Sequence, residues 1–159
     1  MDHHAATTWI YPTNVSVRQY QLSICTAALE NNTLVCLPTG LGKTFIASVL
    51  IYNFYRFYPN GKIVFMAPTR PLVFQQIKAC KDILHLPEQD IAHLEGSISA
   101  DKREKIWKNC RIFFCTPQVF SNDLKSEKCG DPRKFVLVVV DEAHRATQNY
   151  AYTTVVSFV

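Results

Sequence analysis

Short apolar runs alternate with segments of helical periodicity along most of this chain. The run Phe135–Val140, FVLVVV, is apolar at every position, which predicts a strand buried on both faces. Four further runs predict strands: Thr33–Leu37, Lys62–Ala67, Ile91–Leu94 and Arg111–Cys115. Apolar residues at helical spacing predict helices over Arg18–Glu30, Lys43–Tyr55, Pro71–Leu84, Asp101–Lys108, Gln118–Leu124 and Tyr150–Val159.

This alternation of strands and helices predicts an α/β fold, a mostly parallel sheet with helices on both faces. The length of 159 residues suits one domain. We expect a flexible segment over residues 1–12 and a single domain over residues 13–159. In sheets of this kind, ligands bind beyond the carboxyl ends of the strands, so chemically useful residues should follow the strands directly.

Composition excludes some classes of protein but does not identify a binding partner. Apolar residues make up 48% and charged residues 19% of the chain, which excludes disorder and collagen-like repeats. The net charge of +4 permits a nucleic-acid partner but does not demand one. The N-terminus has no signal-peptide pattern, and the longest apolar stretch is too short for a bilayer, so we expect a soluble intracellular chain without a membrane partner. Six cysteines form no metal-binding spacing; we expect reduced thiols, with Cys25, Cys36, Cys80 and Cys115 as small core residues.

A glycine-rich turn between the first predicted strand and its helix is typical of a phosphate-binding loop. The loop consists of Pro38, Thr39, Gly40, Leu41, Gly42, Lys43 and Thr44. Glycines let the backbone turn its N–H groups toward phosphate oxygens, and the helix N-terminus adds positive charge. Lys43 can reach the β and γ phosphates of a nucleotide, and the Thr44 hydroxyl can hold Mg²⁺. The strict motif starts with glycine where this chain has Leu37, and the bland alternative is a glycine turn before an ordinary helix.

Two acidic residues follow the most apolar predicted strand. Asp141 and Glu142 come directly after Val140, and His144 lies two positions further on. A carboxylate at a strand end can bind Mg²⁺, and a second one can polarise an attacking water. Most Asp-Glu pairs are solvated surface charges, but a phosphate-binding loop upstream strengthens the catalytic interpretation.

Three other predicted strands end in polar loops that suit contact with a sugar–phosphate backbone. These loops carry Thr69 and Arg70, Gly96 and Ser97, and Thr116. Hydroxyl groups, an arginine and helix N-termini all bind phosphate oxygens. For any one loop, helix capping by Ser and Thr is the favoured explanation, whereas three loops at one sheet edge beside an ATP site favour a nucleic-acid track.

Taken together, these sequence segments resemble the first RecA-like domain of a superfamily 2 DEAH-box helicase. LPTGLGKT is similar to motif I, APTRPLV to motif Ia, TPQ to motif Ib and DEAH to motif II, while RQYQ resembles the upstream adenine-recognition motif. The longer segments around these motifs resemble the Fanconi anaemia group M family and its archaeal relative Hef. They are TWIYPTN, LVCLPTGLGKTFIA, VFMAPTRPLV and DEAHRA with NYAY.

The resemblance implies an ATP-dependent, Mg²⁺-requiring translocase on branched DNA that acts in DNA repair in the nucleus. It implies that Arg18 and Gln21 contact adenine, that the loop residues hold phosphates and that Thr44 and Asp141 hold Mg²⁺. It further implies that Lys43, Asp141, Glu142 and His144 act in catalysis. Thr69, Arg70, Gly96, Ser97 and Thr116 would contact the DNA backbone.

The resemblance also implies parts that these residues do not supply. A second RecA-like domain would contribute an arginine, and histone-fold partners would bind outside this segment. We therefore expect this chain to bind ATP but to hydrolyse it poorly. Two alternatives stay open: a double-stranded-RNA helicase domain of the Dicer and innate-sensor type, and a non-catalytic binding module.

Overall fold

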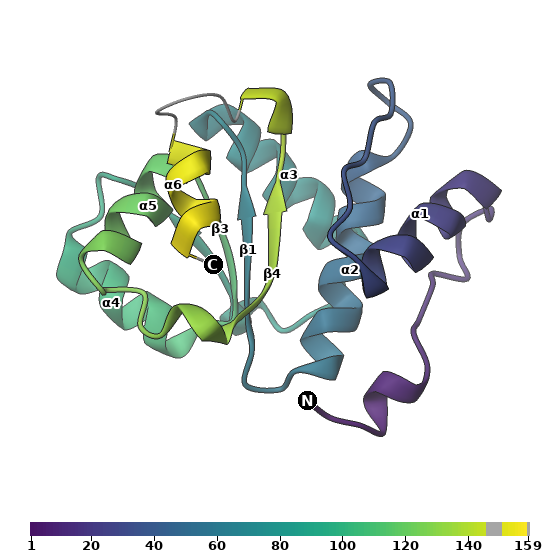
Figure 1. Ribbon diagram of the computed structural model, residues 1–159, viewed down its shortest axis with the longest axis horizontal. Coiled ribbons are helices and arrows are strands. Elements are labelled where there is room, and N and C mark those ends of the chain that lie inside the picture. The colour runs from purple at the N-terminus through teal and green to yellow at the C-terminus, as the bar shows by residue number, and fades with distance from the viewer. Residues whose placement is uncertain (146–150, 159) are drawn as a thin grey trace.

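The computed structural model, described over residues 1–145 and 151–158, contains a four-stranded parallel sheet in the order β2-β3-β1-β4 (Figure 1). Its strands are β1 (Lys62–Met66), β2 (Ile91–Leu94), β3 (Ile112–Cys115) and β4 (Phe135–Val140). The last residues of all four strands lie in register, because Met66 pairs with Cys115 and Val140, and Leu94 pairs with Cys115. The α/β fold that the sequence predicts is therefore confirmed.

Six helices connect and cover the strands in the described part of the chain. They are α1 (Gln19–Glu30), α2 (Lys43–Phe57), α3 (Arg70–Ile83), α4 (Ala100–Asn109), α5 (Pro117–Lys125) and α6 (Ala151–Phe158). Each agrees with a predicted helix to within two residues at either end, although the predicted Tyr150 and Val159 lie outside the described residues. Prolines in the first turn of α3 and α5 explain those sharp starts, because proline has the helical φ and no N–H to lose.

The sheet is covered by α2 and α3 on one face and by α4, α5 and α6 on the other (Figure 1). On the first face, Phe65 and Phe114 of neighbouring strands stack with ring centroids 5.4 Å apart, beneath apolar residues of both helices. On the second face, fully buried Trp107 of α4 contacts Phe113, Phe120 and Phe135. Alternate strand residues thus enter opposite cores, as a sheet sandwiched by helices requires.

A third apolar cluster joins α1 and the N-terminal residues to the outer side of α2. Cys25 of α1 packs with Ile46 and Val49, and Trp9 and Tyr11 lie against this cluster. The backbone of Ile10 donates to and accepts from the buried amide of Asn53 at 2.7 and 2.8 Å. These contacts place residues 9–11 against α2, whereas the flexibility expected for residues 1–12 stays a prediction.

The predicted strand Thr33–Leu37 is wrong in this structure. The segment has no strand pairing, and Leu34 is 74% exposed. Its apolar pattern predicts an extended, buried segment, but a strand is buried only when it pairs with a neighbouring strand. This segment has no such neighbour, because the described sheet ends at β4. Cys36 in this segment is exposed rather than a core residue, whereas Cys25, Cys80 and Cys115 are buried as expected.

The expectation that Phe135–Val140 is buried on both faces is also wrong in part. Only Phe135 is buried, and Val136–Val140 are half-buried. β4 pairs with β1 on one side and forms an edge of the described sheet, so its side chains lack neighbours on the other side.

The structure also answers two smaller expectations. All six cysteines are free thiols. No helix in the described ranges is long and apolar enough to cross a membrane.

A buried ion pair stabilises the face that α4 and α5 cover, and it yields a prediction. Arg103 donates to both carboxylate oxygens of Asp123, at 2.7 to 3.1 Å, and fully buried Asp123 also accepts from the Trp107 indole. Replacing Arg103 with methionine leaves a buried carboxylate without its cation. We expect Arg103→Met to lower the free energy of unfolding by about 3–5 kcal/mol, measured by urea denaturation.

The matched control is Lys108→Met, which breaks an exposed pair with Glu104 on the same helix. We expect it to cost less than about 1 kcal/mol. Equal losses in the two variants would contradict the assignment of Arg103–Asp123 as the ion pair that the core requires.

Candidate nucleotide and nucleic-acid site

The predicted phosphate-binding loop is a tight turn that leads directly into α2. Gly40 and Gly42 have φ values of +83° and +89°. A residue with a side chain would be strained in this backbone conformation. Gly42 is the residue before the first turn of α2, so the N–H groups of that turn open toward the loop. Backbone donors and the positive helix end thus face the same space, as a phosphate site requires.

Residues around α1 hold this loop from behind. Tyr20 and Gln21 both donate to the carbonyl oxygen of Leu41, at 3.0 and 3.2 Å, and Arg18 donates to the Tyr20 hydroxyl. Gln21 is buried against Gly42, so closely that a β-carbon there would lie 2.2 Å from its Nε2. The structure therefore places Arg18 and Gln21, the predicted adenine contacts, beside the loop, and Gln21 contacts its backbone.

The loop lysine lies across its own turn. Lys43 Nζ donates to the carbonyl oxygen of Leu37 at 2.9 Å and is half-buried. Pro38 and Thr39 form the exposed start of the turn. The ammonium group is thus held beside the loop, where it could bind phosphate together with the loop N–H groups.

A chain of hydrogen bonds joins the loop to the end of β4. The Thr44 hydroxyl donates to Gln76 Oε1 at 2.7 Å, and Gln76 Nε2 donates to Asp141 Oδ2 at 3.1 Å. Gln76 lies on α3, so three elements that are far apart in the sequence meet at this point. The structure therefore brings the two predicted Mg²⁺ ligands, Thr44 and Asp141, together.

The acidic pair lies at the carboxyl edge of the sheet. The Asp141 N–H donates to the Met66 carbonyl at 2.9 Å, and Asp141 Oδ1 accepts from the Glu142 N–H. Glu142 has a φ of +53°, an uncommon value for a residue with a side chain. This turn separates its carboxylate from that of Asp141 and leaves it 3.4 Å from Nδ1 of exposed His144.

The residues at this edge fit a magnesium ion by their chemistry. Hydroxyl and carboxylate oxygens are hard ligands, and Mg²⁺ binds through one or two such groups together with phosphates and water. Among residues 1–145 and 151–158 no group of three or more His, Cys, Asp or Glu side chains could hold a metal.

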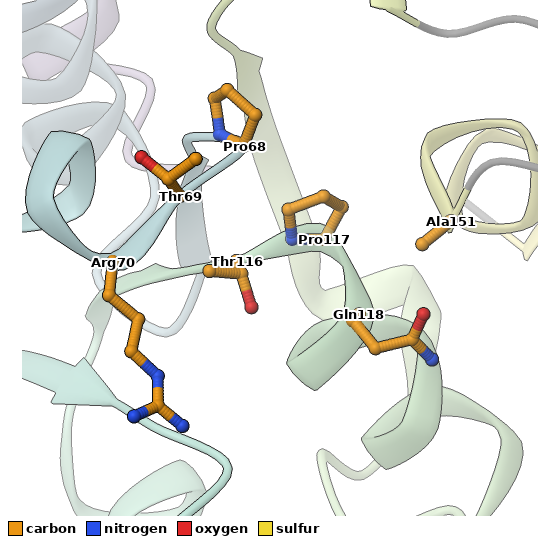
Figure 2. Close-up of a pocket in the computed structure, with 7 residues that line it drawn as sticks. All are labelled: Pro68, Thr69, Arg70, Thr116, Pro117, Gln118 and Ala151. Carbon is orange, nitrogen blue, oxygen red and sulfur yellow. The ribbon is translucent and has the colours of Figure 1, made fainter.

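Three loops at the same sheet edge form a second, neighbouring surface. Thr69 and Arg70 follow β1, Gly96 and Ser97 follow β2, and Thr116 follows β3. Thr69, Arg70, Thr116 and Gln118 line one hollow of about 220 Å³. Figure 2 shows these four side chains. Gly96 lies near the Arg70 guanidinium, because a β-carbon there would be 4.0 Å from Nη2. The structure thus brings the five predicted nucleic-acid contacts together on one edge.

An aromatic pair flanks this surface. Phe74 of α3 is 55% exposed and meets the His93 ring edge-on at 4.4 Å. Burial lowers the pKa of His93, and Arg70 lowers it further, while Glu95 opposes the shift. Near neutral pH the ring is therefore uncharged, and Arg70 carries the positive charge of this patch.

Sequence reasoning missed two residues that hold the site together. Tyr20 and Gln76 link the loop to α1 and α3, but neither belongs to a phosphate-loop or acidic motif. A helical projection of α3 could have signalled Gln76, since it shares a face with buried Val73 and Cys80.

Comparison with known proteins assigns the chain to a family. Residues 14–159 match the family model described as type III restriction enzyme, res subunit. The chain belongs to this family. Three proteins with similar sequences or structures are described next.

The mouse Fanconi anemia group M protein homolog is 56% identical over 153 residues, which are 96% of this chain and 8% of that protein. ATP-dependent DNA helicase MPH1 of Saccharomyces cerevisiae is 52% identical over 159 residues, or 16% of its length. The crystal structure of the Pyrococcus furiosus Hef helicase domain superposes with a TM-score of 0.82 at 37% identity, over 89% of this chain and 30% of that one. The chain thus spans a small part of these curated relatives.

The two loop glycines offer a matched test of how Gln21 supports the loop. Both have positive φ, but a β-carbon at Gly40 meets nothing within 4 Å, whereas one at Gly42 meets Gln21. We expect Gly40→Ala to lower the free energy of unfolding by about 1–2 kcal/mol from backbone strain alone. Gly42→Ala should cost about 1 kcal/mol more, because Gln21 must leave the Leu41 carbonyl.

A double-mutant cycle in urea denaturation separates the two causes. In a Gln21→Ala background, Gly42→Ala should cost no more than Gly40→Ala does. If the excess cost of Gly42→Ala persisted without the Gln21 side chain, the contact would not be its cause.

Proposed function

We propose that this chain is the ATP-binding half of an ATP-dependent DNA translocase. The observation that carries the proposal is the hydrogen-bonded path from Thr44 through Gln76 to Asp141. It joins a phosphate-type loop to a strand-end carboxylate, which is the minimum that a magnesium nucleotide needs from a protein.

Each residue of the site then has a definite role. Gly40, Gly42 and the first turn of α2 would present N–H groups to the phosphates, and Lys43, which contacts the Leu37 carbonyl in this structure, would bind a phosphate. Thr44 and Asp141 would hold Mg²⁺, which would supply positive charge to neutralise the phosphates. Glu142 orients the attacking water, and His144 beside it reports the state of the nucleotide to a partner domain. Arg18 and Gln21 contact the adenine side.

The neighbouring loops supply the nucleic-acid track. Thr69, Ser97 and Thr116 offer hydroxyl donors, Gly96 lets a backbone approach closely, and Arg70 supplies the charge. These groups bind phosphate and sugar and do not read bases, so the binding is expected to be independent of sequence. Such contacts suit a motor that moves along DNA.

The wider role is inferred from relatives named as an ATP-dependent DNA helicase and as a Fanconi anemia group M protein homolog. By this reasoning the parent protein remodels branched DNA at stalled forks and recombination intermediates in the nucleus, with histone-fold partners that bind elsewhere. A second RecA-like domain would close the cleft with an arginine worth about 10³–10⁵ in rate. We therefore expect the isolated 159 residues to bind ATP and to hydrolyse it poorly.

Two other functions are less well supported. A double-stranded-RNA helicase would use the same ATP motifs, but the curated relatives cited above are named for DNA helicases or for the Fanconi anemia group. A non-catalytic binding module would not need the Thr44–Gln76–Asp141 path. Competition between fork DNA and duplex RNA separates the nucleic acids, since only RNA offers a 2′-hydroxyl.

The first test of the proposed function removes the loop lysine. We expect Lys43→Ala to weaken binding of a fluorescent ATP analogue about 10- to 100-fold, because a charge-assisted contact to phosphate is lost. Lys81→Ala is the control, since Lys81 is exposed on α3 and pairs with Glu88 instead. Equal affinity in wild type and Lys43→Ala would overturn the nucleotide-binding function.

The second test addresses the nucleic-acid track. We expect Arg70→Ala to weaken fork-DNA binding and to reduce the slope of log affinity against log salt by about 1, because one phosphate contact is lost. The matched control is Arg133→Ala, since exposed Arg133 precedes β4 at the opposite end of the sheet. An unchanged slope in Arg70→Ala, or an equal change in both variants, would refute the proposed track.

A further inference from the structure

We propose that Gln76 is a positioning residue that orients both magnesium ligands of the nucleotide site. This inference rests on the proposed function, because it concerns how that site holds its ion. No phosphate-loop or acidic motif includes Gln76, so its role is inferred from its position in the structure. It is the residue of α3 that touches Thr44 of α2 and Asp141 after β4 at once.

The packing of α3 on α2 fixes where Gln76 lies. One helical turn beyond the Thr44–Gln76 contact, Ser48 Oγ lies 3.3 Å from Cys80 Sγ. Each residue of this second contact lies four positions after its counterpart in the first, and both Ser48 and Cys80 are buried. The two helices therefore lie in register along this line, and this packing keeps the backbone of Gln76 beside Thr44.

The amide orientation follows from its two partners. Asp141 is a carboxylate that only accepts, so it must face the Gln76 NH₂ group. The Gln76 carbonyl oxygen then faces Thr44, whose hydroxyl must donate to it. The reversed amide would set its oxygen against a carboxylate, so only one arrangement satisfies both neighbours.

This arrangement leaves the ligand atoms ready for a cation. Because the Thr44 hydroxyl gives its proton to Gln76, its lone pairs remain free for a metal. Gln76 and the Glu142 N–H each take one oxygen of Asp141, which fixes the plane of the carboxylate while further lone pairs stay available. Outer partners of this kind orient metal ligands, and their loss typically costs about 10- to 100-fold in metal affinity.

The experiment measures how much Mg²⁺ strengthens nucleotide binding. A fluorescent ADP is titrated with the 159-residue chain in Mg²⁺ and again in EDTA, and the ratio of the two dissociation constants is the magnesium gain. Gln76→Met keeps the length of the side chain but neither hydrogen bond, and Gln75→Met is the matched control at an exposed position of the same helix. Gln76→Ala serves as a second variant, and circular dichroism reports whether each variant is folded.

We expect Gln76→Met and Gln76→Ala to reduce the magnesium gain about 10-fold or more, with affinity in EDTA unchanged and with Gln75→Met like wild type. A merely structural role would lower affinity equally in Mg²⁺ and in EDTA, and that outcome would overturn the inference. A wild-type magnesium gain in a folded Gln76 variant would overturn it as well. Wild-type protein that binds no nucleotide in either buffer would instead overturn the proposed function, and this inference with it.

Discussion

The alignment of the four strand ends is the constraint on which the rest of this structure depends. Met66, Leu94, Cys115 and Val140 lie in register through parallel pairing. Because every crossover returns to the same end of the sheet, each strand delivers its following loop to one edge. The acidic pair and the three polar loops therefore meet at this edge although they are far apart in the sequence.

The second requirement is that the phosphate loop reaches this edge although the segment before it pairs with no described strand. The loop is held by other means: α2 packs beneath it, Gln21 and Tyr20 fix its backbone, and Thr44 contacts Gln76. α3 connects the two halves of the site, since it carries Arg70 at its start and Gln76 in its middle. One helix thus contributes to both the proposed nucleotide site and the proposed nucleic-acid surface.

Much of this could be predicted from the sequence, and the failures have physical causes. Helix periodicity and turn residues are local signals, so the helices and the paired strands were predicted closely. Burial of Thr33–Leu37 and of Val136–Val140 depends on which neighbours a strand has, and apolarity alone does not contain that information. The motif residues can be predicted from the sequence because their chemistry is tied to short spacing, and their roles stay predictions. The helical pattern of α3 shows which face Gln76 lies on, but its contacts with Thr44 and Asp141 arise from packing between elements that are far apart in the sequence.

Paramagnetic broadening would show whether the loop and the end of β4 form one magnesium-nucleotide site. Mn²⁺ with ADP would be added to isotope-labelled protein, and backbone amide signals would be followed by NMR. We expect the signals of Thr44, Gln76 and Asp141 to broaden together, while those of Arg133 at the opposite end of the sheet stay sharp. Broadening at the loop alone, with Asp141 unaffected, would contradict a single shared site.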